Sequence, residues 1–202
     1  MRYYIFLINK KNMKKVIVIY GLPASGKSTQ AKLLEKKYGW QHFSMGEKLR
    51  ALIKSGSDIG AKAKDIVENG LLVPDDIILA TLGPVAEQAH STGIVFDGFP
   101  RKQEQAQILD KLLTDTGAEV NACLLLEVSG ETVQKRINSR LSVEARSDDQ
   151  DSAVVKNRVE VFEQESLPLC AYYEAQNKLY RLDGEKNVEE IFEKICEIVE
   201  NL

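Results

Sequence analysis

The chain has 202 residues, of which 27 are basic and 30 acidic, and its formal net charge is -3. This near-balance argues against a dedicated nucleic-acid binder, which normally carries a basic excess. The apolar fraction of 44% is usual for a globular domain, and no run approaches the ~20 apolar residues that span a membrane. Three cysteines without a CxxC pair favour neither a zinc site nor a disulfide framework. We therefore expect a reducing compartment, the cytoplasm.

The first residues of the chain differ in pattern from the rest. Met13 precedes two lysines and a strong strand pattern, so we expect an N-terminal extension or tag over 1–13 and a single domain over 14–202. The apolar run at 3–8 is too short for most signal-peptide cores, and no small-residue cleavage site comes after it.

Apolar strands alternate with helical patterns along the rest of the chain. The predicted strands lie near 16–20, 42–44, 94–96, 122–128 and 178–183. The predicted helices follow Gly26 and then lie near 46–54, 58–69, 74–86, 102–114, 130–139, from 152 with a break or bend at Pro168, and at 188–202, where the stripe 188, 191, 192, 195, 199 and 202 is apolar. This alternation predicts a parallel sheet with helices on both faces, which binds ligands beyond the carboxyl ends of its strands.

The strongest motif runs from Gly21 to Ser28, where GLPASGKS matches the phosphate-binding pattern G-x-x-x-x-G-K-[ST]. It follows a predicted strand and opens a predicted helix, as the motif requires. Glycines let the backbone N–H groups point at phosphate oxygens, and the helix N-terminus adds its positive dipole end. Lys27 can reach the β- and γ-phosphates, and the Ser28 hydroxyl can ligate Mg²⁺.

A P-loop leaves motor, GTPase, transporter and small-kinase functions open. The guanine motif N-K-x-D is not met, because Tyr180 stands where the aspartate would follow Asn177 and Lys178. The small size and the absence of a long insert disfavour a transporter ATPase. Arginines at predicted loop and helix ends favour a kinase that holds a phosphorylated acceptor, since guanidinium groups bind phosphate bidentately. The set is Arg50, Arg101, Arg136, Arg140, Arg146 and Arg158.

Further segments resemble the adenylate kinases, within the wider nucleoside monophosphate kinase family. The resemblance covers about residues 14–202. The segments that carry it are 44–50, 70–75, 97–101 with Gln105, and 146–149 with Arg158. They resemble the family's patterns S-T-G-D-x-L-R, G-x-L-V-P-D, D-G-F-P-R and R-x-D-D…R, of which the third is close to diagnostic.

The resemblance implies a fold and a reaction. The fold is a three-layer α/β P-loop fold with a five-stranded parallel sheet in the order 2-3-1-4-5, an acceptor-binding insert at about 44–73 and a short lid at about 136–147. The reaction is the reversible transfer of the terminal phosphoryl group of MgATP to AMP, giving two ADP, for adenylate homeostasis. We expect a monomer with ATP, AMP and ADP as partners, without nucleic acid, membrane or structural zinc. Closure of insert and lid would exclude water.

The resemblance also implies individual roles. Those for catalysis fall to Lys27, Arg101, Arg140, Arg146 and Arg158. Those for ATP binding fall to Ala24, Ser25, Gly26, Lys27, Ser28, Thr29, Arg136, Arg140 and Lys186. Those for AMP binding fall to Ser44, Met45, Arg50, Leu71, Leu72, Val73, Gly98, Phe99, Pro100, Arg101, Gln105, Arg146 and Arg158. Magnesium would be held by Ser28, and by Asp97 through water.

One departure bears on the acceptor. Met45 stands where adenylate kinases usually carry Thr and related pyrimidine kinases Ala, and a thioether cannot donate a hydrogen bond. Gln105 favours adenine, because the pyrimidine-directed relatives usually have Asn. A kinase of the same fold for UMP, CMP or another monophosphate, and a catalytically silent adenylate-binding module, are the alternatives. For His42 we expect an ordinary structural or surface role, and for Cys123 a buried one.

Overall fold

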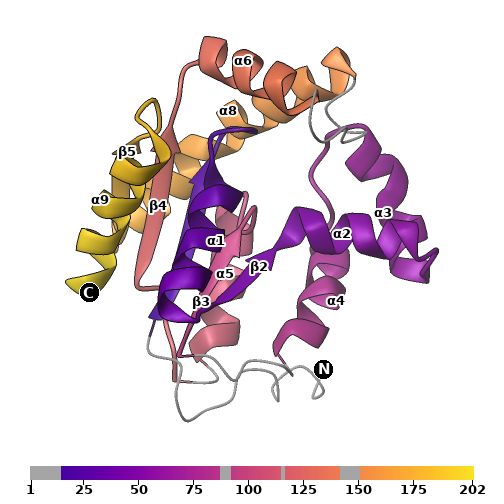
Figure 1. Ribbon diagram of the computed structural model, residues 1–202. Helices are drawn as coiled ribbons and strands as arrows, with labels where there is room; N and C mark the ends of the chain where they lie inside the picture. Colours follow the sequence, from indigo (N-terminus) through magenta and orange to yellow (C-terminus); the bar gives the residue numbers. More distant parts are fainter. Residues whose placement is uncertain (1–14, 87–91, 115–116, 142–150) are drawn as a thin grey trace.

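The computed structural model describes residues 15–86, 92–114, 117–141 and 151–202 (Figure 1). The strands form one parallel sheet in the order β2-β3-β1-β4-β5. They are β1 (Lys15–Gly21), β2 (Gln41–Ser44), β3 (Gly93–Asp97), β4 (Ala122–Glu127) and β5 (Leu179–Asp183). The predicted sheet and its strand order are confirmed.

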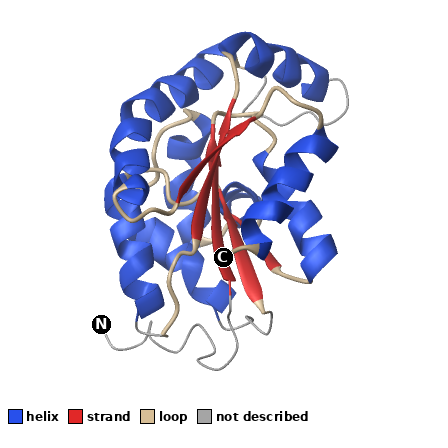
Figure 2. Cartoon of the chain, turned by 90° about the vertical axis from the view of Figure 1, so that its left-hand side faces the viewer, coloured by secondary structure: helices blue, strands red, loops and turns tan. Residues whose placement is uncertain are grey.

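Helices cover both faces of this sheet (Figure 2). They are α1 (Lys27–Tyr38), α2 (Met45–Lys54), α3 (Asp58–Glu68), α4 (Asp75–Ala86), α5 (Gln103–Thr114), α6 (Gly130–Leu141), α8 (Ser152–Glu174) and α9 (Val188–Glu200). Several begin at polar residues whose side chains accept a backbone N–H of the first turn, as Ser44 does for Glu47 and Asn187 for Glu190.

The central strand β1 explains the layers. Because successive side chains of a strand point to opposite faces, Val16 and Val18 enter one core and Ile17 and Ile19 the other. The first core is covered by α4, α5 and α8, the second by α1 and α9. Every side chain from Val16 to Tyr20 is buried, as the apolar run predicts for a central parallel strand.

Two regions stand away from these layers. α2 and α3 project beyond β2, while α6 and the start of α8 lie above the carboxyl ends of the strands (Figure 1). The range expected for the insert, about 44–73, contains α2 and α3, and the range expected for the lid, about 136–147, begins within α6. Residues 142–150 lie outside the described residues. Both regions therefore border the carboxyl ends of the strands, where the P-loop lies.

Two details of the predicted helices differ in the structure. α8 continues as one helix through Pro168, so the predicted break does not occur. Pro168 is exposed, and on an exposed face the carbonyl that loses its donor can be hydrated. Val188 and Leu202 do not belong to the buried stripe of α9, being 41% and 36% exposed, since one opens the helix and the other lies beyond its end. Within the described ranges, no helix is both long and apolar enough to cross a membrane.

Candidate active site

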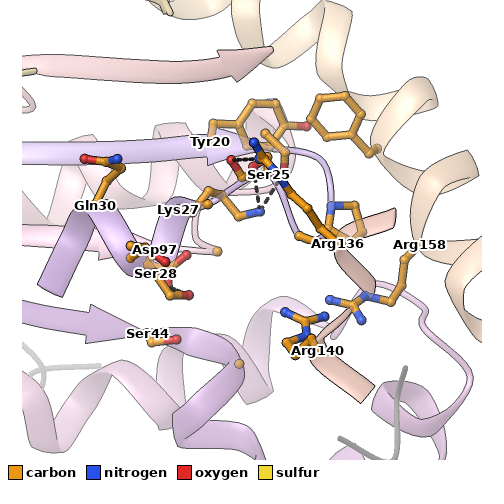
Figure 3. Close-up of a pocket in the computed structure, with 18 of the residues that line it drawn as sticks. Tyr20, Ser25, Lys27, Ser28, Gln30, Ser44, Asp97, Arg136, Arg140 and Arg158 are labelled. Carbon is orange, nitrogen blue, oxygen red and sulfur yellow. Dashed lines mark hydrogen bonds between the residues drawn. The ribbon is translucent and has the colours of Figure 1, made fainter. Parts of the chain in front are cut away.

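A cleft of about 510 Å³ lies at the carboxyl ends of β1 and β3 (Figure 3). Many of the predicted site residues line it together: Ala24, Ser25, Gly26, Lys27, Ser28, Thr29, Ser44, Arg50, Asp97, Gly98, Arg101, Arg136, Arg140, Arg158 and Lys186. A smaller cavity of about 50 Å³ is lined by Met45, Arg50, Leu71, Leu72, Val73, Gly98, Arg101, Gln105 and Arg158. Arg50, Gly98, Arg101 and Arg158 border both, so the two spaces adjoin.

Three predicted residues are not among those linings. Phe99 is 1% exposed and packs in the core, and Pro100 is also buried, so these two can serve a ligand only through the backbone that they hold. Arg146 lies outside the described residues.

The side chain of Lys27 makes hydrogen bonds to the backbone of its own P-loop. Lys27 Nζ donates to the carbonyl oxygens of Gly21 at 2.9 Å and Leu22 at 2.7 Å. A Cβ on Gly21 would lie 2.6 Å from Leu126 O, so the tight turn from β1 requires glycine there. Removal from water is the main reason that the pKa of Lys27 falls to about 7, with Asp97 opposing the shift. A bound phosphate would favour the charged form of this lysine.

Asp97 ends β3 beside the first turn of α1. Ser28 Oγ donates to Asp97 Oδ2 at 2.5 Å, and His42 Nε2 lies 3.4 Å from the same oxygen. Burial raises the pKa of Asp97, but the His42 hydrogen bond, the Lys27 charge and the Ser28 hydrogen bond outweigh it and leave that pKa below its usual value. The carboxyl is therefore ionised at neutral pH.

Arginines reach the cleft from several elements. Arg136 on α6 donates to Ser25 O at 3.1 Å and to Gly184 O at 2.8 Å, so it ties the P-loop to the loop after β5. Arg140 and Arg158, from α6 and α8, point toward one another across the opening (Figure 3). Like charges that converge in this way make a site for a polyanion.

Arg101 is oriented by its own turn. Its Nε donates to Gly98 O at 3.0 Å, and burial, with the Arg158 charge adding to it, lowers its guanidinium pKa. Its backbone N–H donates to Gln105 Oε1 at 2.9 Å. Gln105 is 1% exposed, and its Oε1 is held by this bond, so the amide nitrogen is the group left to face the smaller cavity.

The remaining walls of the smaller cavity are apolar. They are formed by the side chains of Met45, Leu49, Val67, Leu71, Leu72, Val73 and Ile78. Met45 is 2% exposed and belongs to the main core. The cavity therefore combines apolar walls with the amide of Gln105.

Two neighbours of the cleft were not singled out from the sequence. Tyr20 lines it directly before the P-loop and packs on Phe162 of α8, with ring centroids 5.0 Å apart; its place at the end of a strand that enters the motif was the available signal. His42, expected to be structural or on the surface, is buried beside Asp97. The signal for His42 was its spacing of two from Ser44, which places both side chains on one face of β2.

Comparison with known sequences shows the family of this chain. The sequence model of the adenylate kinase family matches residues 19–178. The chain is 37% identical to the adenylate kinase of Flavobacterium johnsoniae over 187 residues, which cover 92% of this chain and 98% of that protein. It is 40% identical to that of Parabacteroides distasonis with the same coverage. It is 37% identical to that of Thermus thermophilus over 181 residues, 90% of this chain and 95% of that protein. The chain belongs to the adenylate kinase family.

Proposed function

We propose that this chain transfers the terminal phosphoryl group of MgATP to AMP, reversibly, giving two ADP, and so maintains the adenylate balance. The observation that carries the proposal is the junction of two spaces. A P-loop cleft rich in arginines opens onto an apolar cavity that ends in an amide, and Arg50, Arg101 and Arg158 border both. Family membership supports the same reaction.

The cleft would hold the donor. The loop from Ala24 to Thr29 would cradle the β- and γ-phosphates with its backbone N–H groups, aided by Lys27. The Arg136 guanidinium is held by hydrogen bonds to two carbonyl oxygens. It would pack on the adenine, with Lys186 beside it. Arg140 would contact the donor phosphates.

The donor set of the cleft fits magnesium. Ser28 and Asp97 supply hard oxygen ligands, and Mg²⁺ is usually held by one or two protein groups together with substrate phosphates. Within the described ranges, no three His, Cys, Asp or Glu side chains form an all-protein metal cage, which this mode of binding does not require. The ion, when bound, neutralises charge on the transferring phosphoryl group. Ser28 would hold it directly, and Asp97 through water.

The acceptor would lie in the smaller cavity. Arg50 and Arg101 would bind its phosphate, and the walls at 71–73 and Met45 would enclose its base. With Oε1 bonded to the Arg101 N–H, Gln105 can offer only donors to the ring. Adenine N1 accepts such a hydrogen bond, whereas the ring N–H of uracil, guanine or hypoxanthine would oppose it. This supports AMP and makes CMP, with its acceptor N3, the second choice over UMP.

Catalysis would consist of positioning and of charge stabilisation. Lys27, Arg101, Arg140, Arg146 and Arg158 would surround the transferring group, where fixed cations lower the barrier most. Closure of the insert at about 44–73 and of the lid at about 136–147 would bring the last of these cations in and exclude water.

The surroundings of the chain are part of the proposal. We propose a cytoplasmic monomer that works on free ATP, AMP and ADP. The free, buried state of Cys123, Cys170 and Cys196 supports a reducing compartment.

The test is phosphoryl transfer from MgATP to AMP, dAMP, CMP, UMP and GMP, followed as diphosphate formation. We expect AMP to be preferred, with K27A folded but nearly inactive. A pyrimidine preference would keep the fold and overturn the acceptor. No transfer to any acceptor, with ATP still bound, would leave the silent binding module as the function.

A further inference from the structure

One oxygen of Asp97 receives the contacts of both Ser28 and His42. Ser28 Oγ donates to Oδ2 at 2.5 Å, and His42 Nε2 lies 3.4 Å from the same atom. The His42 and Asp97 side chains are only 5% and 4% exposed. Since an ionised carboxylate can only accept, the hydrogen of this contact belongs to His42 Nε2. That holds for the Nε2–H tautomer and for the protonated ring alike.

The sheet determines this contact. β2 pairs in parallel with β3, with His42 opposite Val95 and Ser44 opposite Asp97. His42 therefore points to the same face as the carboxylate, one pleat below it. Ser44 and Asp97 line the cleft, and His42 is not among its lining residues. The contact that joins the His42 side chain to this lining is the one with Asp97.

Two donors on one oxygen have an orienting effect. They oppose rotation of the carboxylate about its Cβ–Cγ bond and keep Oδ1 available for another contact. The Ser28 hydroxyl, in turn, directs its hydrogen to Asp97, so its lone pairs face away from that carboxylate. Partners of this kind, which orient the groups that hold a metal, commonly affect metal affinity by about 10–100-fold.

We propose that His42 is a positioning residue for magnesium binding. By donating to Asp97 Oδ2 it holds the carboxylate, and through it the Ser28 hydroxyl, in the orientation that receives the cation with ATP. The inference rests on the proposed function, because it places MgATP in this P-loop. It departs from the expectation of an ordinary structural role, which predicts loss of stability without a specific effect on the metal.

The experiment compares H42L and H42Q with the unmodified chain. Leucine keeps approximate volume and removes the donor, whereas glutamine restores an N–H at similar reach. V95A, which truncates the buried partner of His42 on β3, is the matched control for packing in the same layer. The probe is Mn²⁺, counted by the electron paramagnetic resonance signal of the free ion. Each protein is mixed with a smaller amount of a non-hydrolysable ATP analogue, so that the analogue is bound, and Mn²⁺ is then titrated into the mixture.

We expect H42L to raise the Mn²⁺ dissociation constant about tenfold, the lower end of the usual range, while H42Q and V95A stay within about twofold of the unmodified chain. The dissociation constant for AMP should be unchanged in all four proteins, and the free Mg²⁺ needed for half-maximal ADP formation should rise only in H42L. Equal Mn²⁺ binding by H42L and the unmodified chain would overturn the inference, as would equal losses in H42L and V95A.

The two proposals fail in different ways. If the unmodified chain binds Mn²⁺ with the analogue, and H42L weakens this binding, but no ADP forms from AMP, the positioning role stands and the kinase proposal is wrong. If ADP forms normally and the Mn²⁺ dissociation constant is the same in H42L and the unmodified chain, the kinase proposal holds and His42 contributes to packing alone.

Discussion

The orientation of Gln105 determines whether this side chain donates or accepts a hydrogen bond at the acceptor base. Its Oε1 accepts the Arg101 N–H at 2.9 Å, so the amide nitrogen faces the ring. Q105E keeps an oxygen for that N–H and replaces the donor by a second acceptor. AMP and IMP report this change, because the two rings have the same size but opposite hydrogen-bonding character at N1 and at the adjacent 6-substituent.

The magnitude follows from the burial of this side chain, which is 1% exposed. For AMP, the variant loses one hydrogen bond and leaves a charged acceptor without its partner, which together cost about 3 kcal/mol, or roughly 100-fold. For IMP, the N1–H gains a charge-assisted bond of about 1.5 kcal/mol, or roughly tenfold. The ratio of kcat/KM for AMP over IMP should therefore fall by roughly a thousandfold.

The assay is diphosphate formation from MgATP with each acceptor, together with the thermal unfolding midpoint of each protein. E104Q is the matched control, because Glu104 is exposed on the same turn of α5 and the substitution is the reverse exchange. An AMP over IMP ratio in Q105E within about threefold of the unmodified value, in a protein that unfolds normally, would refute the assignment of Gln105 as the group that reads the ring.

Three further substitutions test the supports of the site. R136K removes the fork that ties two loops together, so we expect ATP binding about tenfold weaker by calorimetry with AMP binding unchanged; an equal loss for both would contradict this. G70A forces a Cβ to 2.7 Å from Val154 O at a φ of +72°, so urea unfolding should show a loss of about 2 kcal/mol, and an unchanged midpoint would disprove the close approach. Hydrogen bonds led by the Ser129 N–H lower the pKa of Glu185 to about 2, so its stabilisation is present above its ordinary 4.5 and is lost as pH falls to about 2. The difference in unfolding midpoint between the unmodified chain and E185Q should shrink over that window, and a constant difference would contradict it.

The parts of the site that a short motif encodes could be predicted from the sequence. The P-loop needs only the turn from β1 into α1, so its eight residues suffice to place Lys27 and Ser28. Asp97 ends β3, Arg101 stands in the turn directly after it, and both line the cleft. The strand order, by contrast, followed from the resemblance to a family, because spacing alone does not say which strands are neighbours.

Other features depended on contacts that are distant in the chain. His42 reaches Asp97 across 55 positions, through a register between two strands that no local pattern encodes. The orientation of Gln105 depends on the backbone N–H of Arg101. A backbone group of this kind cannot be predicted from residue types. Of the break or bend expected at Pro168, the break does not occur. Proline removes one backbone hydrogen bond, and on an exposed face water can replace it.

The turn after β3 links the two halves of the proposed reaction. In that proposal Asp97 would face the metal and Arg101, four residues later and held to Gly98 O at 3.0 Å, would face the acceptor. One short segment at the carboxyl end of β3 would then position both the cation and the acceptor phosphate. Arg140 and Arg158 come instead from α6 and α8, which lie above this edge (Figure 1). Movement of these helices would change the charge around the phosphates and, through Arg158, one wall of the smaller cavity, while Asp97 and Arg101 would keep their places. Under the proposed function, such a division would let the site bind both nucleotides before the last cations complete it, an order that would protect ATP from water.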